Sequence, residues 1–397
     1  MIRSCRLIKK IMLLLCFFVA LIPLFSVKGE EQDDILSLTR RYGYSVKPAD
    51  KPVSSIVVNA KNGDIIWQDN IDASRDPASM SKLFTLYLLF EDIKAGKLSL
   101  SDHIRASQTD QDISQIYAIS NNKIVAGVDY PIRDLITMTA VPSSNAATLM
   151  LANYMSDNDA GAFINRINAT AQKLGMKNTF FTNASGAVAS AFEGHYSPEG
   201  YDSNQPNKTS ARDLAILCYH FLKNYPEILE FTCKSSVKTM DRTPYEEEFH
   251  SYNYSLPGDK FGIKGVDGLK TGSSPSAAFN AVITAKRDDT RLISIVMGVG
   301  DWSDQEGEFH RHPFINAITE YGFTDDALHQ NNHPNIILAD THKTNENHSR
   351  HYKNKNEPKT FYDKFEKFVD RHHHFVFLCL SLFIISVLIT SLIAIYK

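Results

Sequence analysis

The chain has 397 residues, of which 43% are hydrophobic and 22% are charged, with a formal net charge of −3. This is the composition of a globular protein with enough chain for one large domain or two modest ones. Nothing in this nearly neutral charge balance suggests a nucleic-acid partner, so we expect none.

The first segment has the layout of a secretory signal. Four basic residues precede an apolar run over residues 11–25, and small residues such as Gly29 follow. A basic flank, a short apolar run and small residues are typical of a cleaved signal peptide. A transmembrane anchor is the alternative, but the run is short for a bilayer core. We therefore expect a signal peptide over residues 1–29 and an exported body.

Strand signals stand at both ends of the body. Residues 54–59 and 65–67 flank an Asn-Gly dipeptide, which favours a tight hairpin turn. Residues 279–285 and 292–299 are a second pair of apolar segments, and they flank a short polar stretch. These four segments predict an antiparallel sheet that is built from both ends of the domain.

The region between the two hairpins is mainly helical. Helical periodicity covers residues 79–94, 145–155, 161–174 and 211–222. Strands first and last with helices between them favour an α+β fold. We expect a mixed sheet with helices packed on it.

The composition changes again toward the C-terminus. Residues 331–374 are rich in Asn, His, Lys and Glu, which predicts a solvated tether. Residues 375–396 contain no charge, and at about 1.5 Å per residue they span a hydrocarbon core. We expect a transmembrane helix there, with a buried helix of a soluble protein as the alternative. With an exported N-terminus, the body would lie outside the cytoplasmic membrane.

Two of the five cysteines, Cys218 and Cys233, fall in the body of the chain. An exported protein can form a disulfide between them, and two unpaired thiols are the alternative. The cysteine pattern does not resemble a metal site, so we expect no metal.

A Ser-x-x-Lys motif opens the first long predicted helix. Ser79 and Lys82 are three residues apart, so both side chains lie on one face of the first turn. A serine hydroxyl needs a base to become a nucleophile, and a lysine can be that base when its charged form is destabilised. Taken alone, this spacing is more often a helix cap beside a surface lysine.

A second candidate motif, Ser143-Ser144-Asn145, precedes the helix predicted over residues 145–155. Taken alone it is a helix cap, because Ser and Asn are preferred N-cap residues. In a catalytic site, Ser143 would be a proton relay, and the amide of Asn145 would hold both the base and the substrate backbone.

A third motif, Lys270-Thr271-Gly272-Ser273, comes just before the terminal hairpin. Glycine in a strand often marks a place where a ligand or another backbone approaches closely. A lysine beside a hydroxyl residue can bind a carboxylate and help to move protons. Taken alone, the motif is a loop with a surface lysine.

Three such motifs in this order are far less common by chance than any one of them. Over residues 42–322 the chain resembles a low-molecular-mass penicillin-binding protein of the serine-type D-alanyl-D-alanine carboxypeptidase family. Flanking residues agree with that resemblance: Asp76-Pro77-Ala78, Asn183-Ala184-Ser185-Gly186, Ala211-Arg212-Asp213 and Asp267-Gly268. The resemblance implies a β-lactamase/transpeptidase-like α+β fold over residues 30–330, with an antiparallel sheet flanked by helices and a helical sub-domain.

The resemblance also implies a reaction without a cofactor. Ser79 would attack the penultimate D-alanine of a peptidoglycan stem peptide, D-alanine would leave, and water or an amine would take the acyl group. β-Lactams would acylate the same serine, and backbone N–H groups of Ser79 and Ser273 would form the oxyanion hole. The implied catalytic residues are Ser79, Lys82 and Ser143, and the implied substrate-binding residues are Asn145, Lys270, Thr271, Gly272 and Ser273.

Two alternatives on the same fold are disfavoured. A class A β-lactamase usually has Ser-Asp-Asn as its middle motif and needs a Glu-x-x-x-Asn loop, but neither Glu193 nor Glu199 is followed by Asn at that spacing. A non-catalytic β-lactam-binding or wall-binding protein would be expected to lose Ser79, Lys82 or Lys270, and all three are present. A polar tether occupies the place of the second, β-rich domain of many relatives, so we expect that domain to be absent or vestigial.

Overall fold

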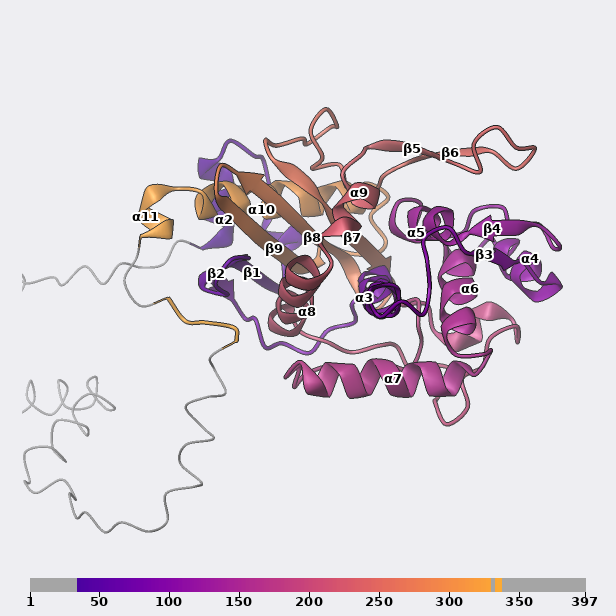
Figure 1. Cartoon of the computed structure of the whole chain (residues 1–397). Coiled ribbons are helices and arrows are strands. Elements are labelled where there is room, and N and C mark those ends of the chain that lie inside the picture. Colours follow the sequence, from indigo (N-terminus) through magenta and orange to yellow (C-terminus); the bar gives the residue numbers. More distant parts are fainter. Residues whose placement is uncertain (1–33, 330–332, 338–397) are drawn as a thin grey trace, which may run out of the picture. The chain divides into compact units, whose positions relative to one another are not determined.

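A five-stranded sheet is the frame of the protein in the computed structural model, which describes residues 34–329 and 333–337 (Figure 1). The strand order is β2-β1-β9-β8-β7. The strands are β1 (Ser54–Asn59), β2 (Ile65–Asp69), β7 (Val266–Ser274), β8 (Ala278–Arg287) and β9 (Thr290–Val299).

Both predicted hairpins are present, and β1 from the first pairs with β9 from the second. The sheet is therefore built from both ends of the domain, as predicted. Every pairing within it is antiparallel, so the expectation of a mixed sheet is wrong. A parallel pair needs a crossover connection, whereas here β8 follows β7 and β9 follows β8 through tight turns.

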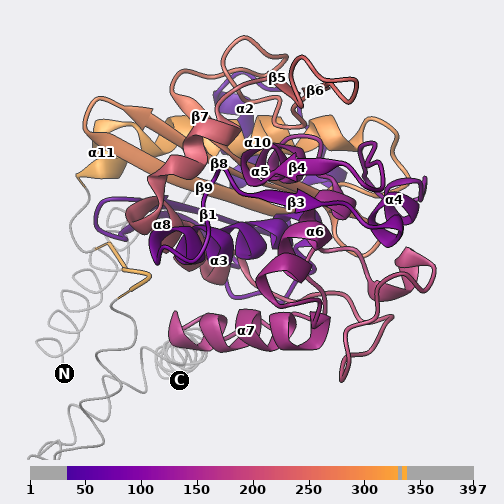
Figure 2. The same cartoon turned by 45° about the vertical axis from the view of Figure 1, so that its right-hand side comes forward.

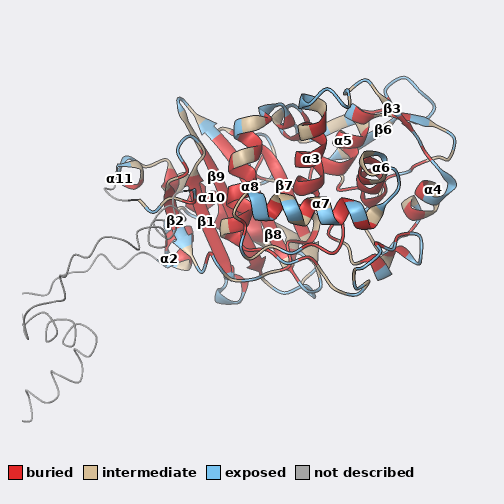
Figure 3. Ribbon diagram, turned by 60° about the horizontal axis from the view of Figure 1, so that its bottom comes forward, coloured by how far each residue is buried: buried red, intermediate tan, exposed pale blue. Residues whose placement is uncertain are grey.

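Helices cover both faces of the sheet. On one face lie α2 (Ile35–Arg41) and α10 (Gly307–Gly322), and on the other lies α8 (Ala211–Asn224). The residues of β1 alternate between these faces, because side chains in a strand have a period of two. Ile56 and Val58 join the core on the α8 side, and Val57 joins the core on the α10 side. Figure 3 shows the central strands buried.

A helical region extends from the α8 side of the sheet. Figure 2 shows α7 below α3 and α6, and these helices contact one another. The helices of this region are α3 (Lys82–Lys94), α4 (Gln108–Ser114), α5 (Ile132–Ala140), α6 (Asn145–Met155) and α7 (Ala160–Lys173). The four predicted helices are confirmed, with one local difference: the turn over Ala78–Ser81 is a 3-10 helix, η3.

The remaining elements are short. Two strand pairs, β3 with β4 and β5 with β6, lie outside the main sheet. Their bounds, with those of the short helices, are β3 (His103–Arg105), β4 (Asp129–Pro131), β5 (Ser236–Thr239), β6 (Glu247–His250), η2 (Pro48–Asp50), η4 (Ala189–Phe192), η5 (Pro226–Ile228), α9 (Leu229–Thr232) and α11 (Asp325–Leu328).

The segment over residues 333–337 returns to the edge of the sheet. The amide of Ile65 donates to the carbonyl of Pro334 at 2.7 Å, and Ile336 is buried. The predicted signal peptide (1–29), most of the predicted tether and the predicted transmembrane helix (375–396) lie outside the described residues. Within the described part of the chain, no helix combines the length and the apolar character needed to cross a membrane.

The two cysteines of the body are unpaired. Cys218 is buried in α8, and Cys233 is exposed just after α9. Burial raises the pKa of Cys218 to about 12, so this thiol is protonated and unreactive at neutral pH. The alternative of two free thiols is therefore confirmed.

Candidate active site

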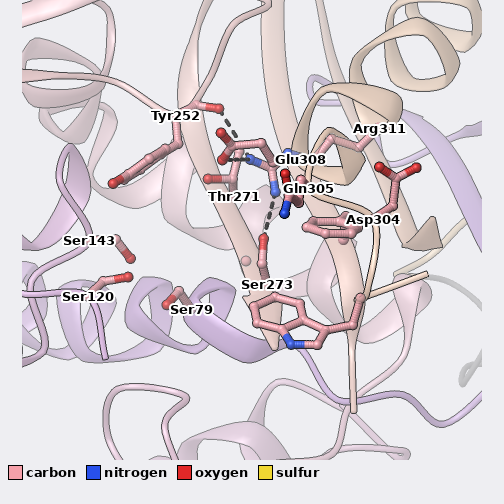
Figure 4. Close-up of a pocket in the computed structure, with 13 residues that line it drawn as sticks. Ser79, Ser120, Ser143, Tyr252, Thr271, Ser273, Asp304, Gln305, Glu308 and Arg311 are labelled. Carbon is pink, nitrogen blue, oxygen red and sulfur yellow. Dashed lines mark hydrogen bonds and ion pairs between the residues drawn. The ribbon is translucent and has the colours of Figure 1, made fainter. Parts of the chain in front are cut away.

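A cavity of about 350 Å³ lies where the helical region meets β7. Figure 4 shows Ser79, Ser120 and Ser143 on one side of it and Thr271, Arg311 and Glu308 on the other. The residues that line it are Ser79, Ser120, Ser143, Tyr252, Thr271, Gly272, Ser273, Phe279, Trp302, Asp304, Gln305, Glu308 and Arg311. Residues from all three predicted motifs therefore line one cavity.

The 3-10 turn η3 presents the hydroxyl of Ser79 to this cavity. Ala78 has a φ of +47°, which is rare for a residue with a side chain. The Asp76 carboxylate accepts a hydrogen bond from the Ala78 amide at 2.7 Å, which stabilises this turn. Lys82 then begins α3 with its amine 3.0 Å from Ser79 Oγ. The predicted neighbourhood of the two side chains is thus present.

Lys82 is fully buried among oxygen atoms. Its Nζ donates to Asn145 Oδ1 at 2.9 Å and to the carbonyl of Ser185 at 2.8 Å. Burial, and then the charge of Lys270, hold the pKa of Lys82 well below its ordinary value. A neutral amine has two N–H groups and one lone pair. Because two oxygens take the N–H groups, the lone pair is free to accept the Ser79 hydroxyl.

In the middle motif, Ser144 and Asn145 make different contacts. Ser144 caps α6, since its Oγ accepts the amide of Ala147 at 3.1 Å. Asn145 faces Lys82, and its Nδ2 and backbone amide both donate to the carbonyl of Ser120, at 2.8 and 2.9 Å. The helix-cap interpretation is therefore confirmed, and Asn145 lies beside Lys82.

Ser143 lies in the left-handed region, with a φ of +64°. Its side chain is buried at the cavity wall, and among the described residues its Oγ has no hydrogen-bond partner. A buried hydroxyl without a partner is unusual, because such groups are nearly always satisfied. An unsatisfied hydroxyl at the edge of the cavity suits a group that exchanges a proton with a ligand.

The third motif lies on β7, against the nucleophile turn. A Cβ atom on Gly272 would lie 2.5 Å from the carbonyl oxygen of Pro77 and 3.0 Å from the amide nitrogen of Ser79. Only glycine permits this contact, so the close approach predicted for Gly272 is present. Thr271 and Ser273, on either side of it, line the cavity.

Lys270 is buried, and its Nζ donates to the carbonyl of Thr271 at 3.1 Å. Burial, and then the charge of Arg311, lower the pKa of Lys270 to about 7. It is buried and is not among the residues that line the cavity.

Arg311, from the first half of α10, is a cation of the site that sequence reasoning missed. Its Nη1 donates to Ser273 Oγ at 2.8 Å, and its Nη2 lies 4.0 Å from Glu308 Oε2. Burial lowers the pKa of Arg311 to about 10, so it keeps its charge at neutral pH. Helical periodicity did not identify it, since an arginine in a helix usually faces solvent.

Asp76 joins the nucleophile turn to the end of β7. Its Oδ2 accepts the hydroxyls of Ser274, at 2.8 Å, and of Ser276. Its carbonyl accepts Nδ2 of Asn280 on β8 at 2.9 Å. These bonds fix the spacing between the two backbones that face the cavity.

The Asn-Ala-Ser-Gly segment, which supported the resemblance only as a flanking match, is also part of the site. Gly186 has a φ of +95°, and a Cβ atom there would lie 2.0 Å from the carbonyl oxygen of Ala78. The backbone carbonyl of its neighbour Ser185 accepts a hydrogen bond from the Lys82 amine. A backbone acceptor has no signature in the sequence, so spacing could not have identified it.

Acidic residues are placed differently from those of a class A β-lactamase. Glu193 and Glu199 are exposed and do not line the cavity. The acids that do line it, Asp304 and Glu308, come from the segment after β9. Within the described ranges, no group of three or more His, Cys, Asp or Glu residues is arranged to hold a metal ion.

Comparison with known proteins gives one consistent family. The sequence profile described as D-alanyl-D-alanine carboxypeptidase matches residues 45–301. D-alanyl-D-alanine carboxypeptidase DacF of Bacillus subtilis is 29% identical over 278 residues, which are 70% of this chain and 63% of that protein. DacA of Escherichia coli is 27% identical, over 64% of this chain and 58% of its own length. The chain thus spans about three fifths of these curated relatives.

Solved structures give the same result. PBP3 of Streptococcus pneumoniae, described as a peptidoglycan synthesis regulatory factor, has a TM-score of 0.62 and 26% identity, covering 68% of this chain and 72% of that one. Penicillin-binding protein D2 of Listeria monocytogenes, in its ampicillin-bound form, has a TM-score of 0.55 and 27% identity. That match covers 71% of this chain and 100% of the other.

Proposed function

Because the chain belongs to the D-alanyl-D-alanine carboxypeptidase family and has the α+β fold of penicillin-binding proteins, we propose that it is itself a serine-type D-alanyl-D-alanine carboxypeptidase. The observation that carries this proposal is the buried Lys82 amine, held 3.0 Å from Ser79 Oγ with its N–H groups directed to two oxygens. The predicted roles of the other motif residues are part of the same proposal.

In this reaction Lys82 takes the proton of Ser79 as Oγ attacks the carbonyl carbon of the penultimate D-alanine. The negative charge on the carbonyl oxygen then faces backbone N–H groups of Ser79 and Ser273, which Gly272 and Asp76 keep at a fixed spacing. The C–N bond breaks, and the proton returns to the leaving amine through the unpaired hydroxyl of Ser143. Free D-alanine leaves an ester on Ser79.

The terminal carboxylate of the substrate would be held from the opposite wall. Thr271 and Arg311 line the cavity with a hydroxyl and a positive charge, and Lys270, next to Thr271 on β7, can add a second positive charge. A carboxylate placed here has its partners before it binds, so little reorganisation is needed. Water or an amine then attacks the ester, which is why hydrolysis and transpeptidation share one intermediate.

A β-lactam would also acylate Ser79, and the resulting ester would be hydrolysed slowly. Glu193 and Glu199 lie outside the cavity, so neither is in a position to activate the water that a class A β-lactamase uses. The Listeria relative has been solved in ampicillin-bound and cefotaxime-bound forms, which supports β-lactams as inhibitors of this chain.

The decisive experiment uses the full-length chain beside its Ser79→Ala variant. We expect penicillin to add one equivalent to Ser79, seen by mass spectrometry, and a peptide ending in D-Ala-D-Ala to release D-alanine. Ser79→Ala should do neither. Rapid loss of the adduct with an uncleaved peptide would favour a β-lactamase instead, and no adduct at all would favour a binding protein.

We also propose that the domain works on the outer face of the cytoplasmic membrane, held there by residues 375–396. This rests on the basic and apolar N-terminus and the uncharged C-terminal stretch of the sequence. Replacing residues 338–397 with a soluble tail should leave activity in solution unchanged and alter the peptide composition of the wall in cells. An unchanged wall would contradict the proposal.

A further inference from the structure

A half-exposed tryptophan stands at the mouth of the catalytic cavity. Trp302, in the segment between β9 and α10, lines the cavity with 46% of its surface exposed. A large aromatic ring left in water loses the free energy that its burial would give, so such rings often mark binding surfaces. The proposed acyl transfer does not use this residue.

The ring of Trp302 is held in place from behind. It stacks on Phe279, with ring centroids 5.6 Å apart and an interplanar angle of 24°. Phe279 is itself buried, and its ring fills the space beside Gly307, where a Cβ atom would lie 2.1 Å from it. One face of the indole is therefore supported while other parts of the ring remain open.

The Trp302 segment is also fixed by its own hydrogen bonds. Asp301 Oδ1 accepts the amide of Ser303 at 2.8 Å, and Asp304 Oδ1 accepts the amide of Glu306 at 2.9 Å. Because the backbone on both sides of Trp302 is held in this way, the ring is positioned before any ligand arrives. A contact surface that is already ordered loses less entropy on binding.

The position of the stack along β7 indicates which part of a ligand it meets. Phe279 pairs with Ser273, two residues beyond Thr271. Lys270 and Thr271, which are assigned to the terminal carboxylate, precede Ser273 on β7, so the aromatic pair lies further along the strand than these two residues. It is therefore available to the other end, which carries the acyl group.

We propose that Trp302, supported by Phe279, is a subsite for an apolar or aromatic group on the acyl side of the bond that is cleaved. This inference rests on the proposed function, since it assumes an acyl donor bound to Ser79. A planar or aliphatic group packs on the open indole face and removes it from water. Trp302 is then a specificity-determining residue: it selects among acyl donors and takes no part in proton transfer.

The test compares two β-lactams that share a ring nucleus. Benzylpenicillin carries a phenylacetyl group on the acyl side, and 6-aminopenicillanic acid does not. The second-order rate constant for acylation of Ser79 is measured by mass spectrometry for the full-length chain and for Trp302→Ala. We expect Trp302→Ala to react with benzylpenicillin about tenfold more slowly, while the rate with 6-aminopenicillanic acid changes less than twofold.

Two further variants make the result specific. Trp302→Phe keeps an aromatic face and should retain most of the selectivity for benzylpenicillin. Tyr117→Ala removes an aromatic side chain that is fully exposed, at 102%, and is not among the residues lining the cavity, so both rates should stay as in the parent.

Equal losses with both compounds in Trp302→Ala would overturn the inference, because Trp302 would then support the site as a whole. Unchanged rates with both would also overturn it. A parent protein that forms no adduct with either compound would refute the proposed function, and the subsite with it. Failure of the subsite alone is therefore distinguishable from failure of the acyl transfer.

Discussion

Two buried lysines flank the catalytic cavity, and their surroundings differ. Lys82 lies within reach of Ser79, Asn145 and Ser185, and all three present oxygen atoms to its amine. In the part of the chain that the structure describes, the Lys270 amine donates to one acceptor, the carbonyl of Thr271, and it lies near the charge of Arg311. Burial is the largest cause of a lowered pKa in both. The neighbours, and not burial, therefore decide what each amine can do.

In the proposed reaction, this difference favours a neutral amine at Lys82 and a charged amine at Lys270. Lys82 donates to neutral oxygen acceptors, and burial and the charge of Lys270 disfavour its charged form, so it is suited to take a proton from Ser79. Lys270, with a pKa of about 7, is divided between its two forms at neutral pH. A substrate carboxylate would favour the charged form of Lys270. In the proposed reaction the same residue type would thus serve as a base on one side and as a charge on the other.

The largest expected effect is the loss of the base. Lys82→Met keeps an unbranched side chain, one atom shorter, and removes the amine, so the acylation rate constant should fall by about 10³-fold or more. Lys270→Met should cost about 10- to 100-fold, mainly as weaker binding of peptides with a free carboxylate. Stopped-flow acylation and steady-state D-alanine release measure the two effects.

A peptide whose C-terminus is amidated is the matched control. It lacks the carboxylate, so Lys270→Met should alter its turnover little while Lys82→Met still abolishes it. Equal losses in both variants and with both peptides would remove the distinction between base and charge.

The comparison also shows how far the sequence could predict the site. The contact between Ser79 and Lys82 is local, because a spacing of three residues in a helical turn brings the side chains together. The hairpins could also be predicted from the sequence, since alternating apolar residues and an Asn-Gly turn are local signals. The close approach at Gly272 followed from a glycine within a strand. For these features, local chemistry and the final fold agree.

The surroundings of both lysines could not be predicted in this way. Lys82 depends on backbone carbonyls such as that of Ser185, and any residue type can present a carbonyl. Arg311 reaches Ser273 from a helix packed on the sheet, at a separation that no motif encodes. Trp302 had no distinguishing pattern either. The tertiary fold brings these groups together, so identifying them required coordinates.

The smallest expected effect concerns stability and isolates Lys270 from catalysis. Its pKa is near 7 in the folded chain and near its ordinary value of 10.5 in the unfolded chain. Between those values the unfolded chain binds more protons, so the free energy of unfolding rises with pH. The contribution reaches at most about 1.4 kcal/mol per pH unit, and it is absent in Lys270→Met. Buried tyrosines with raised pKa values, such as Tyr196, oppose the rise only above about pH 10.

Urea unfolding of the parent chain and of Lys270→Met between about pH 7 and 9.5 measures this difference. The parent should gain stability relative to the variant as the pH rises, whatever their stabilities at pH 7. Lys82→Gln is the internal comparison, because it leaves Lys270 in place and should keep that part of the slope. Parallel curves for the parent and Lys270→Met would mean that Lys270 keeps its ordinary pKa when buried. The two lysines would then differ in pKa as well as in hydrogen bonding, because the pKa of Lys82 is still lowered by burial.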